Sequence, residues 1–238
     1  MLGEDLRELL GDRIPADHSR QVVADHYAGR YLARPDRPRE PRVMDLGCGT
    51  GDSVDLFRSL EPDVRWVGVD IERSPEVAER TRGDAEFVTF DGERLPFESG
   101  SFDLVYCKQV LEHVRHPEPL MAEVARVLRP SGWLAGSTSQ LEAFHSYSVW
   151  NYTPYGLKLI MERAGLELLE VRPAIDGFTL VAWRACGLPR FFYRWWARES
   201  PGNRGISLVG RLARFDHRTV NTAKLVLAGQ FTFLARRP

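Results

Sequence analysis

The stretch VMDLGCGTGDS, residues 43–53, decides the fold, because a short apolar run leads into a turn that is almost all backbone. Asp45 lies near the end of the apolar run, and Gly47, Gly49 and Gly51 follow at alternate positions. Glycine adopts positive φ without strain and lets a ligand approach the main chain closely. The stretch therefore predicts a strand followed by a turn that binds a ligand through its backbone.

The glycine spacing excludes two common phosphate-binding motifs. A dinucleotide fingerprint, G-x-G-x-x-G, needs a third glycine where Asp52 or Val54 stands. The Asp52 carboxylate would also repel a pyrophosphate at the start of the following helix. A phosphate loop needs a G-K-[ST] sequence, which does not follow. We therefore expect a nucleoside-like ligand without phosphate groups.

Short apolar runs alternate with helical patterns over most of the chain. This alternation is typical of βαβ units and predicts an α/β fold with a mostly parallel, doubly wound sheet. Ligands of such sheets bind beyond the carboxyl ends of the strands. The runs that we expect to be strands include RVMDLG, RWVGVDI, FDLVYC, GWLAGSTS, LELLEVRP at 166–173 and AGQFTFLARRP at 228–238.

Two further carboxylates close predicted strands. Asp70 ends RWVGVD, where a carboxylate can accept hydrogen bonds from both ribose hydroxyls, although a helix N-cap is the structural alternative. Asp91, in FDGERLPF, could accept from an adenine amino group, or could simply be a turn residue beside Gly92. Both positions fit the predicted nucleoside-like ligand.

Length and composition indicate an ordinary globular protein of one α/β domain with an appendage, or at most two small domains. The chain has 238 residues, of which 43% are hydrophobic and 27% charged, and no apolar stretch is long enough for a transmembrane helix. Its three cysteines are scattered and form no CxxC pair, so we expect a cytoplasmic protein without a disulfide framework or structural zinc. Residues 171–238 hold twelve basic residues and three acids, which could meet an anionic substrate or simply be solvated or paired with the acidic body.

Together these segments resemble the class I S-adenosylmethionine-dependent methyltransferases, in particular the type 11 family of small-molecule enzymes. The resemblance covers residues 41–170 and rests on VMDLGCGTG, GVDIERS, FDGERLPFESGSFDLVYCKQVLEHV and LMAEVARVLRPSGWLAGST, in that order. It implies a Rossmann-like sheet of seven strands with the last one antiparallel, and S-adenosylmethionine as cofactor.

The resemblance also implies roles for particular residues and a division of the chain. The turn that includes Cys48 would wrap the methionyl end of the cofactor. The remaining cofactor-binding assignments are Asp45 and the Cys107 carbonyl for the amino group, Asp70 for the ribose, Ile71 for packing on adenine, and Asp91 with Gly92 for the adenine amine. We predict one methyltransferase domain with a helical cap (1–40), a cofactor-binding core (41–173), an inserted lid-like segment (174–227) and a last strand (228–238).

Candidate catalytic residues are the histidines His145 and His113. A general base would help a hydroxyl acceptor, and His145 lies in QLEAFHSYSVWNYTPYGL, after the fifth predicted strand, where relatives place acceptor-facing residues. For both histidines a packed, structural role is the alternative. The aromatic residues predicted to contact the substrate are Tyr147, Trp150 and Tyr152. The reaction requires no metal, and the sequence shows no cluster of metal ligands.

The segment between the last two predicted strands is unusually long and both aromatic and basic. A long excursion of this kind is usually functional or disordered, and this one has too many aromatic residues for disorder. It could be a lid over the acceptor, a dimer surface or a patch at a membrane interface. In a helix, Arg190, Arg194 and Arg198 would share one face and could bind an anionic acceptor bidentately.

The sequence favours a small-molecule acceptor, methylated at oxygen, such as a natural product, a sugar or a lipid-linked compound. YCKQ replaces the N/D-P-P-Y motif of enzymes that methylate amino groups in nucleic acids, and we expect no nucleic-acid partner. Two alternatives remain open, an RNA or protein acceptor docked by the basic tail and a non-catalytic cofactor-binding scaffold. The chain is expected to be a monomer or a homodimer.

Overall fold

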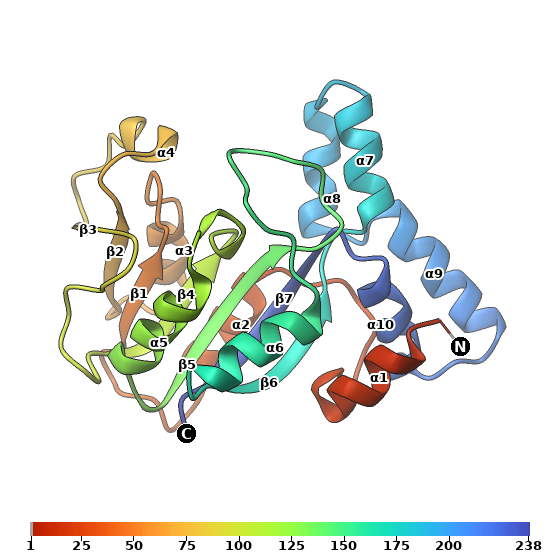
Figure 1. Ribbon diagram of the computed structural model, residues 1–238, viewed down its shortest axis with the longest axis horizontal. Helices are drawn as coiled ribbons and strands as arrows, with labels where there is room; N and C mark the ends of the chain where they lie inside the picture. The colour runs from red at the N-terminus through yellow and green to blue at the C-terminus, as the bar shows by residue number, and fades with distance from the viewer. Residues whose placement is uncertain (1) are drawn as a thin grey trace.

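The fold is built on one seven-stranded sheet, seen in the computed structural model, which describes residues 2–238 (Figure 1). The strand order is β3-β2-β1-β4-β5-β7-β6, and only β7 runs antiparallel to its neighbours. This confirms the predicted doubly wound, Rossmann-like sheet. The strands are β1 (Arg42–Leu46), β2 (Arg65–Ile71), β3 (Glu86–Phe90), β4 (Phe102–Lys108), β5 (Leu128–Ser139), β6 (Glu167–Pro173) and β7 (Gln230–Arg236).

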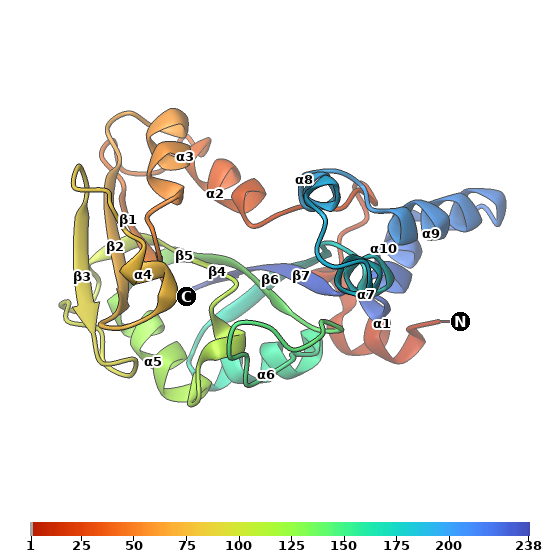
Figure 2. The ribbon, with the colours of Figure 1, turned by 90° about the horizontal axis from the view of Figure 1, so that it is seen from above.

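Helices cover both faces of the sheet, as Figure 2 shows from above. Helices α2 (Asp25–Leu32) and α3 (Ser53–Leu60) pack on one face, and α5 (Pro117–Val127) and α6 (Pro154–Arg163) on the other. The buried side chains of β4 alternate between the two cores, because successive strand residues point to opposite faces. Leu104 and Tyr106 belong to the α2–α3 side, whereas Val105 and Cys107 belong to the α5–α6 side.

The first 40 residues contain α1 (Glu4–Leu10), a 3₁₀ turn (Gly11–Arg13) and α2, separated by a segment without helix. That segment is held to the sheet by Arg172 of β6, whose guanidinium donates to both carboxylate oxygens of Asp17 at 2.8 and 2.9 Å. Residues 34–40 hold two prolines, which prevent α2 from continuing.

The chain between β6 and β7 is helical. It comprises α7 (Gly177–Ala185), the 3₁₀ turn η3 (Arg190–Tyr193), α8 (Arg194–Ala197), α9 (Pro201–Leu212) and α10 (His217–Val226). Buried polar groups fix it in place: the Asp176 carboxylate caps α7 at Thr179 N and accepts from the Ser200 hydroxyl. The buried Lys224 ammonium donates to Glu199 and to the Ser19 carbonyl. Hydrogen bonds therefore tie the insertion together and join it to the segment before α2.

Three arginines of the insertion lie in different kinds of backbone structure. Arg190 lies in η3, Arg194 begins the four-residue α8, and Arg198 is extended. The idea that the three arginines share one helical face is therefore wrong, because the helix ends after one turn. Within residues 2–238, none of the helices combines the length and the apolar composition needed to cross a bilayer.

Candidate functional site

The glycine turn adopts the backbone that the sequence predicted. Gly47, Gly49 and Gly51 have φ of 70°, 49° and 87°, values that side-chain-bearing residues rarely adopt. The Gly47 amide donates to the Val69 carbonyl at 2.7 Å, which ties the turn to β2. A Cβ on Gly51 would stand 2.8 Å from the Phe87 ring, so neighbouring side chains also require glycine. The turn thus presents main chain at the carboxyl ends of β1 and β2.

The Asp70 carboxylate stands against this turn. One oxygen accepts from the Gly49 amide at 2.7 Å and the other from the Ile71 amide at 2.8 Å. Asp70 is not a helix N-cap, because Ser74 caps α4 (Pro75–Ala78) by accepting from Val77 N. Asp70 therefore links the end of β2 to the centre of the glycine turn and keeps lone pairs for a ligand.

An apolar platform lies next to Asp70. Ile71 is 41% exposed although it ends a sheet strand, and a Cβ on Gly92 would lie 3.7 Å from its side chain. One oxygen of Asp91 accepts from the amides of Glu93 and Arg94, and these hydrogen bonds lower the pKa of the Asp91 carboxyl. Asp91 therefore stabilises a turn with this oxygen. Its neighbour Gly92 places it beside the Ile71 side chain.

Asp45 is buried beneath the turn. Its carboxylate accepts from the Ser53 hydroxyl at 2.5 Å, and burial raises its pKa to about 7. Cys107 lies beside Leu46 on the neighbouring strand, which brings its backbone to the edge of the turn. Burial raises the pKa of the Cys48 thiol to about 12, so neither its charge nor its nucleophilicity contributes near neutral pH. A cationic group above Asp45 would relieve the cost of its buried charge.

Sequence reasoning missed Arg80. Its guanidinium donates to the Gly49 carbonyl at 2.7 Å and lies over the Phe87 ring at 4.1 Å. Glu76 lies near the same glycine, with its Cβ 3.1 Å from a Cβ placed there. Glu76 lies within the short helix α4 and Arg80 just after it, and their nearness to Asp70 in the sequence was the available signal.

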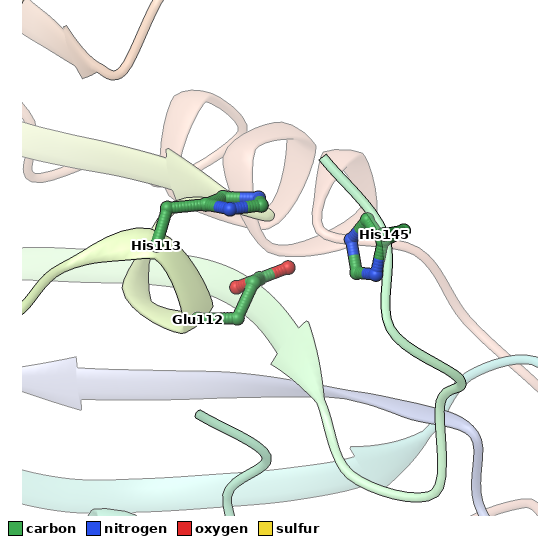
Figure 3. A group of neighbouring side chains, drawn as sticks. All are labelled: Glu112, His113 and His145. Carbon is green, nitrogen blue, oxygen red and sulfur yellow. The ribbon is translucent and has the colours of Figure 1, made fainter. Parts of the chain in front are cut away.

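The second half of the site consists of side chains, Glu112, His113 and His145, which Figure 3 shows turned toward one another. One ligand atom of each lies within 4.8 Å of the others. The two histidine rings meet edge to face with centroids 5.4 Å apart. Glu112 and His113 belong to the 3₁₀ turn after β4 (Leu111–His113), and His145 to the loop after β5. The sequence indicated no such group, because His145 is more than thirty positions from the other two.

Hydrogen bonds hold the Glu112 carboxylate in a buried position. Glu112 is 0% exposed and accepts from the hydroxyls of Thr138 at 2.9 Å and Ser139 at 3.2 Å. Ser139 also donates to Glu142 at 2.7 Å, whose carboxylate lies 3.6 Å from His145 Nδ1. Burial, reinforced by the Glu142 charge, raises the pKa of Glu112 to about 7.

The two halves lie side by side, because a Cβ on Gly47 would stand 2.4 Å from the side chain of Val110, which comes just before the turn that carries His113. Burial lowers the pKa of His113 and the neighbouring His145 acts in the same direction, whereas the charge of Glu76 beside the glycine turn raises it. The His pair therefore lies within electrostatic reach of the helix that covers Gly49. A molecule bound beside the histidines would adjoin one bound at the turn.

The aromatic residues predicted to contact the substrate differ in their surroundings. Tyr147 is 78% exposed, and its φ of 63°, like that of Ser146, is a strained value of the kind that often marks functional loops. Trp150 is partly exposed and donates its ring N–H to the Val114 carbonyl. Tyr152 is only 7% exposed and its hydroxyl donates to the Leu111 carbonyl in the core. Tyr152 therefore packs, and the prediction that it contacts substrate is not supported.

A different arginine of the insertion faces the loop after β5. Arg184 of α7 lies 3.8 Å from the Glu142 carboxylate, and Gly177 lies against Leu141. Of the three predicted arginines, Arg194 stacks on the rings of Trp195 and Phe191. The insertion thus borders the loop through α7, a contact that spacing alone did not indicate.

Comparisons with known proteins agree with this geometry. Residues 44–136 match the family described as a methyltransferase domain, of type 11. The chain is 31% identical over 155 residues to a malonyl-[acyl-carrier protein] O-methyltransferase of Alcanivorax borkumensis, covering 60% of this chain and 52% of that protein. It is 33% identical over 138 residues to the ubiquinone/menaquinone biosynthesis C-methyltransferase of Ectopseudomonas mendocina, covering 52% and 54%.

A solved S-adenosylmethionine-dependent methyltransferase from Mesorhizobium loti shares the fold. Its TM-score is 0.55 at 18% identity, over 90% of this chain and 98% of that one. The chain spans about half the length of the two curated relatives it matches here. The matched residues 44–136 hold the glycine turn and the strands around it, so the similarity extends to the first half of the site.

Proposed function

Since the chain belongs to the type 11 methyltransferases of class I, whose cofactor is S-adenosylmethionine, we propose that it transfers the cofactor's methyl group to a small molecule. The reacting atom we propose is an oxygen, carried by a natural product, a sugar or a lipid-linked compound. The sulfonium methyl of the cofactor is electrophilic when bound, so the protein's main task is to align an acceptor with it.

The observation that carries this proposal is the pairing of the glycine turn with Asp70. The three glycines with positive φ carry no side chains that would cover the backbone, and the Asp70 carboxylate accepts a hydrogen bond from the Gly49 amide. A nucleoside needs a carboxylate for its ribose and an apolar surface for its base, and Asp70 and the exposed Ile71 supply both within adjacent positions. Asp45 supplies a buried negative charge for an ammonium group. The donor set fits S-adenosylmethionine, which has no phosphates.

Residues beyond the ends of β4 and β5 would act on the acceptor. We propose that His145 and His113 contact its reacting end, with Tyr147 and Trp150 around the rest. The support is that the two histidines adjoin each other and border the glycine turn through Glu76. A hydroxyl fits imidazole and carboxylate neighbours, because both can accept its hydrogen bond.

We propose that the insertion at 174–227 walls or closes the acceptor side, as a lid on a single domain that comprises the whole chain. It contacts the loop after β5 through Arg184, which lies near the Glu142 carboxylate. Its arginines, Arg190, Arg194 and Arg198 among them, would suit an acceptor with an anionic group even though these three do not share one helical face. We further propose a cytoplasmic location, which suits three free cysteines, and either a monomer or a homodimer.

The test combines binding with turnover. Titration calorimetry should show one S-adenosylmethionine per chain. Methyl-labelled cofactor should then label a member of a panel of hydroxyl, amine and carbon acceptors, and tRNA and protein extract should stay unlabelled. Labelling of tRNA or protein would replace the small-molecule acceptor with a macromolecule. Cofactor binding without label transfer to the panel or to cell extract would make the protein a non-catalytic scaffold.

A further inference from the structure

We propose that Glu112, His113 and His145 form a binding site for one divalent first-row metal ion, such as Zn²⁺ or Co²⁺. Two imidazoles and one carboxylate are a common ligand set for these ions, and they leave further positions open. The three ligand atoms already lie within 4.8 Å of one another (Figure 3). Among the described residues, 2–238, this is the group of histidine, cysteine and acidic side chains whose ligand atoms converge in this way.

The distances require only a small adjustment. Ligand atoms bound at about 2.0–2.1 Å to a tetrahedral ion stand roughly 3.3–3.5 Å apart. The trio must therefore close by about 1.5 Å at most. His145 can make this movement, because it belongs to a loop rather than to a strand or helix, whereas Glu112 and His113 share one short turn.

The loop and the turn are joined independently of any metal. The amides of Val149 and Trp150 both donate to the Glu112 carbonyl, at 2.6 and 3.1 Å. This places the backbone that carries His145 beside the backbone that carries the other two ligands. The site is therefore assembled by the fold.

The groups around the trio are those that orient metal ligands. A metal-bound histidine usually directs its second nitrogen to a carboxylate or a carbonyl. His145 Nδ1 lies 3.6 Å from the Glu142 carboxylate and 3.4 Å from the Ala143 carbonyl, which leaves Nε2 for a metal. The Glu112 carboxylate is oriented by the hydroxyls of Thr138 and Ser139.

A second acidic side chain, Glu142, lies beside the trio. The carboxyls of Glu112 and Glu142 are buried and both accept from the one hydroxyl of Ser139. The cation that faces them is Arg184, 3.8 Å from Glu142. A divalent ion held by the trio would be balanced by the Glu112 carboxylate, which is buried beside the carboxyl of Glu142.

The site lies where the proposed function places the acceptor. An ion held here would bind an acceptor hydroxyl and lower its pKa, as metal ions do for water and alcohols, so that its proton would pass to solvent. This consequence for catalysis rests on the proposed methyl transfer. Binding of the metal itself does not, so the two can fail separately.

Cobalt(II) alone is the probe, added to the full chain without an affinity tag after treatment with a chelator. Visible absorption should saturate at one equivalent of Co²⁺. His145→Asn and Glu112→Gln should each weaken binding at least tenfold, and Glu142→Gln, which alters only the orienting carboxylate, roughly tenfold. His217→Asn, at an exposed histidine of α10, should bind as the native chain does.

Absence of saturable one-to-one binding, or equal binding by native chain and His145→Asn, would overturn the site. Glu112 is buried, so the Gln variant is first checked by circular dichroism, and His145→Asn decides the matter if that variant does not fold. S-adenosylmethionine is titrated into the same samples. If the chain binds the cofactor but not cobalt, only the metal site is rejected. If it binds cobalt but not the cofactor, only the proposed function is rejected.

Discussion

The two halves of the site are made in different ways. At the turn between β1 and α3, we propose that the ligand is bound mainly by the backbone of Gly47, Gly49 and Gly51, whose positive φ values set the shape of the turn. Beyond β4 and β5, the proposed binding groups are side chains, and Glu112 and His145 come from separate segments of the chain. A ligand shared by many enzymes can be bound by a local backbone pattern, whereas a particular acceptor requires groups assembled by the tertiary fold.

This contrast predicts a separation of effects. Changes at the turn should alter cofactor affinity, and changes at the histidines or the insertion should alter turnover or acceptor affinity. A variant in one half that altered the other half's parameter would show that the halves are coupled. Glu76 is the first candidate, because its side chain lies near Gly49 and its charge raises the pKa of His113.

The largest effect is expected for Gly49→Val. A branched side chain is strained at φ 49°, and its Cβ would lie 3.1 Å from that of Glu76. We expect cofactor affinity to fall by roughly 100-fold or more, measured by calorimetry. Gly83→Val is the matched control, because a Cβ there meets open space. Near-native affinity of Gly49→Val would refute the account of the turn.

If His145 contacts the acceptor's reacting group as proposed, His145→Ala should lower the turnover number by roughly 100-fold and leave cofactor affinity intact. Steady-state kinetics with the acceptor found by the panel and calorimetry with cofactor measure the two quantities. The exposed His217→Ala serves as control. A variant that melts at a lower temperature but keeps its rate would show that His145 only packs.

Asp45 predicts a pH dependence of cofactor binding. Its pKa in the free protein is about 7, and an ammonium above it would lower that value, so binding below pH 7 releases a proton. Affinity should therefore rise roughly 20-fold from pH 5.5 to 7.5, a range in which an α-amino group stays largely protonated. Asp45→Asn should bind more weakly and without this rise. A flat profile for the native chain would remove Asp45 from the cofactor site.

The smallest effect is expected in the insertion. Replacing Arg190, Arg194 and Arg198 with glutamine should raise the acceptor's KM about two- to fivefold, as exposed ion pairs are weak, and should not change cofactor affinity. Unchanged acceptor kinetics combined with a shift from dimer to monomer on a sizing column would make the insertion an assembly surface instead.

What the sequence could predict follows the same division. Positive φ at glycine and a carboxylate closing a strand are local properties, so the amino-acid sequence is enough to place the turn and Asp70. Tyr152 shows the limit, since nearby residues of its loop are exposed while its own ring enters the core. The arginine helix was mispredicted because i, i+4 spacing says nothing of where a helix ends. The meeting of Glu112 with His145 depends on hydrogen bonds between distant backbones, which leave no pattern in the sequence.

The central claim is that Asp70 and the glycine turn bind S-adenosylmethionine, and calorimetric titration of the native chain and of Asp70→Ala tests it most directly. Losing hydrogen bonds to a charged carboxylate costs about 1.5–3 kcal/mol, so affinity should fall roughly 10- to 150-fold. Equal affinity of the two proteins, or no cofactor binding by the native chain, would contradict the account.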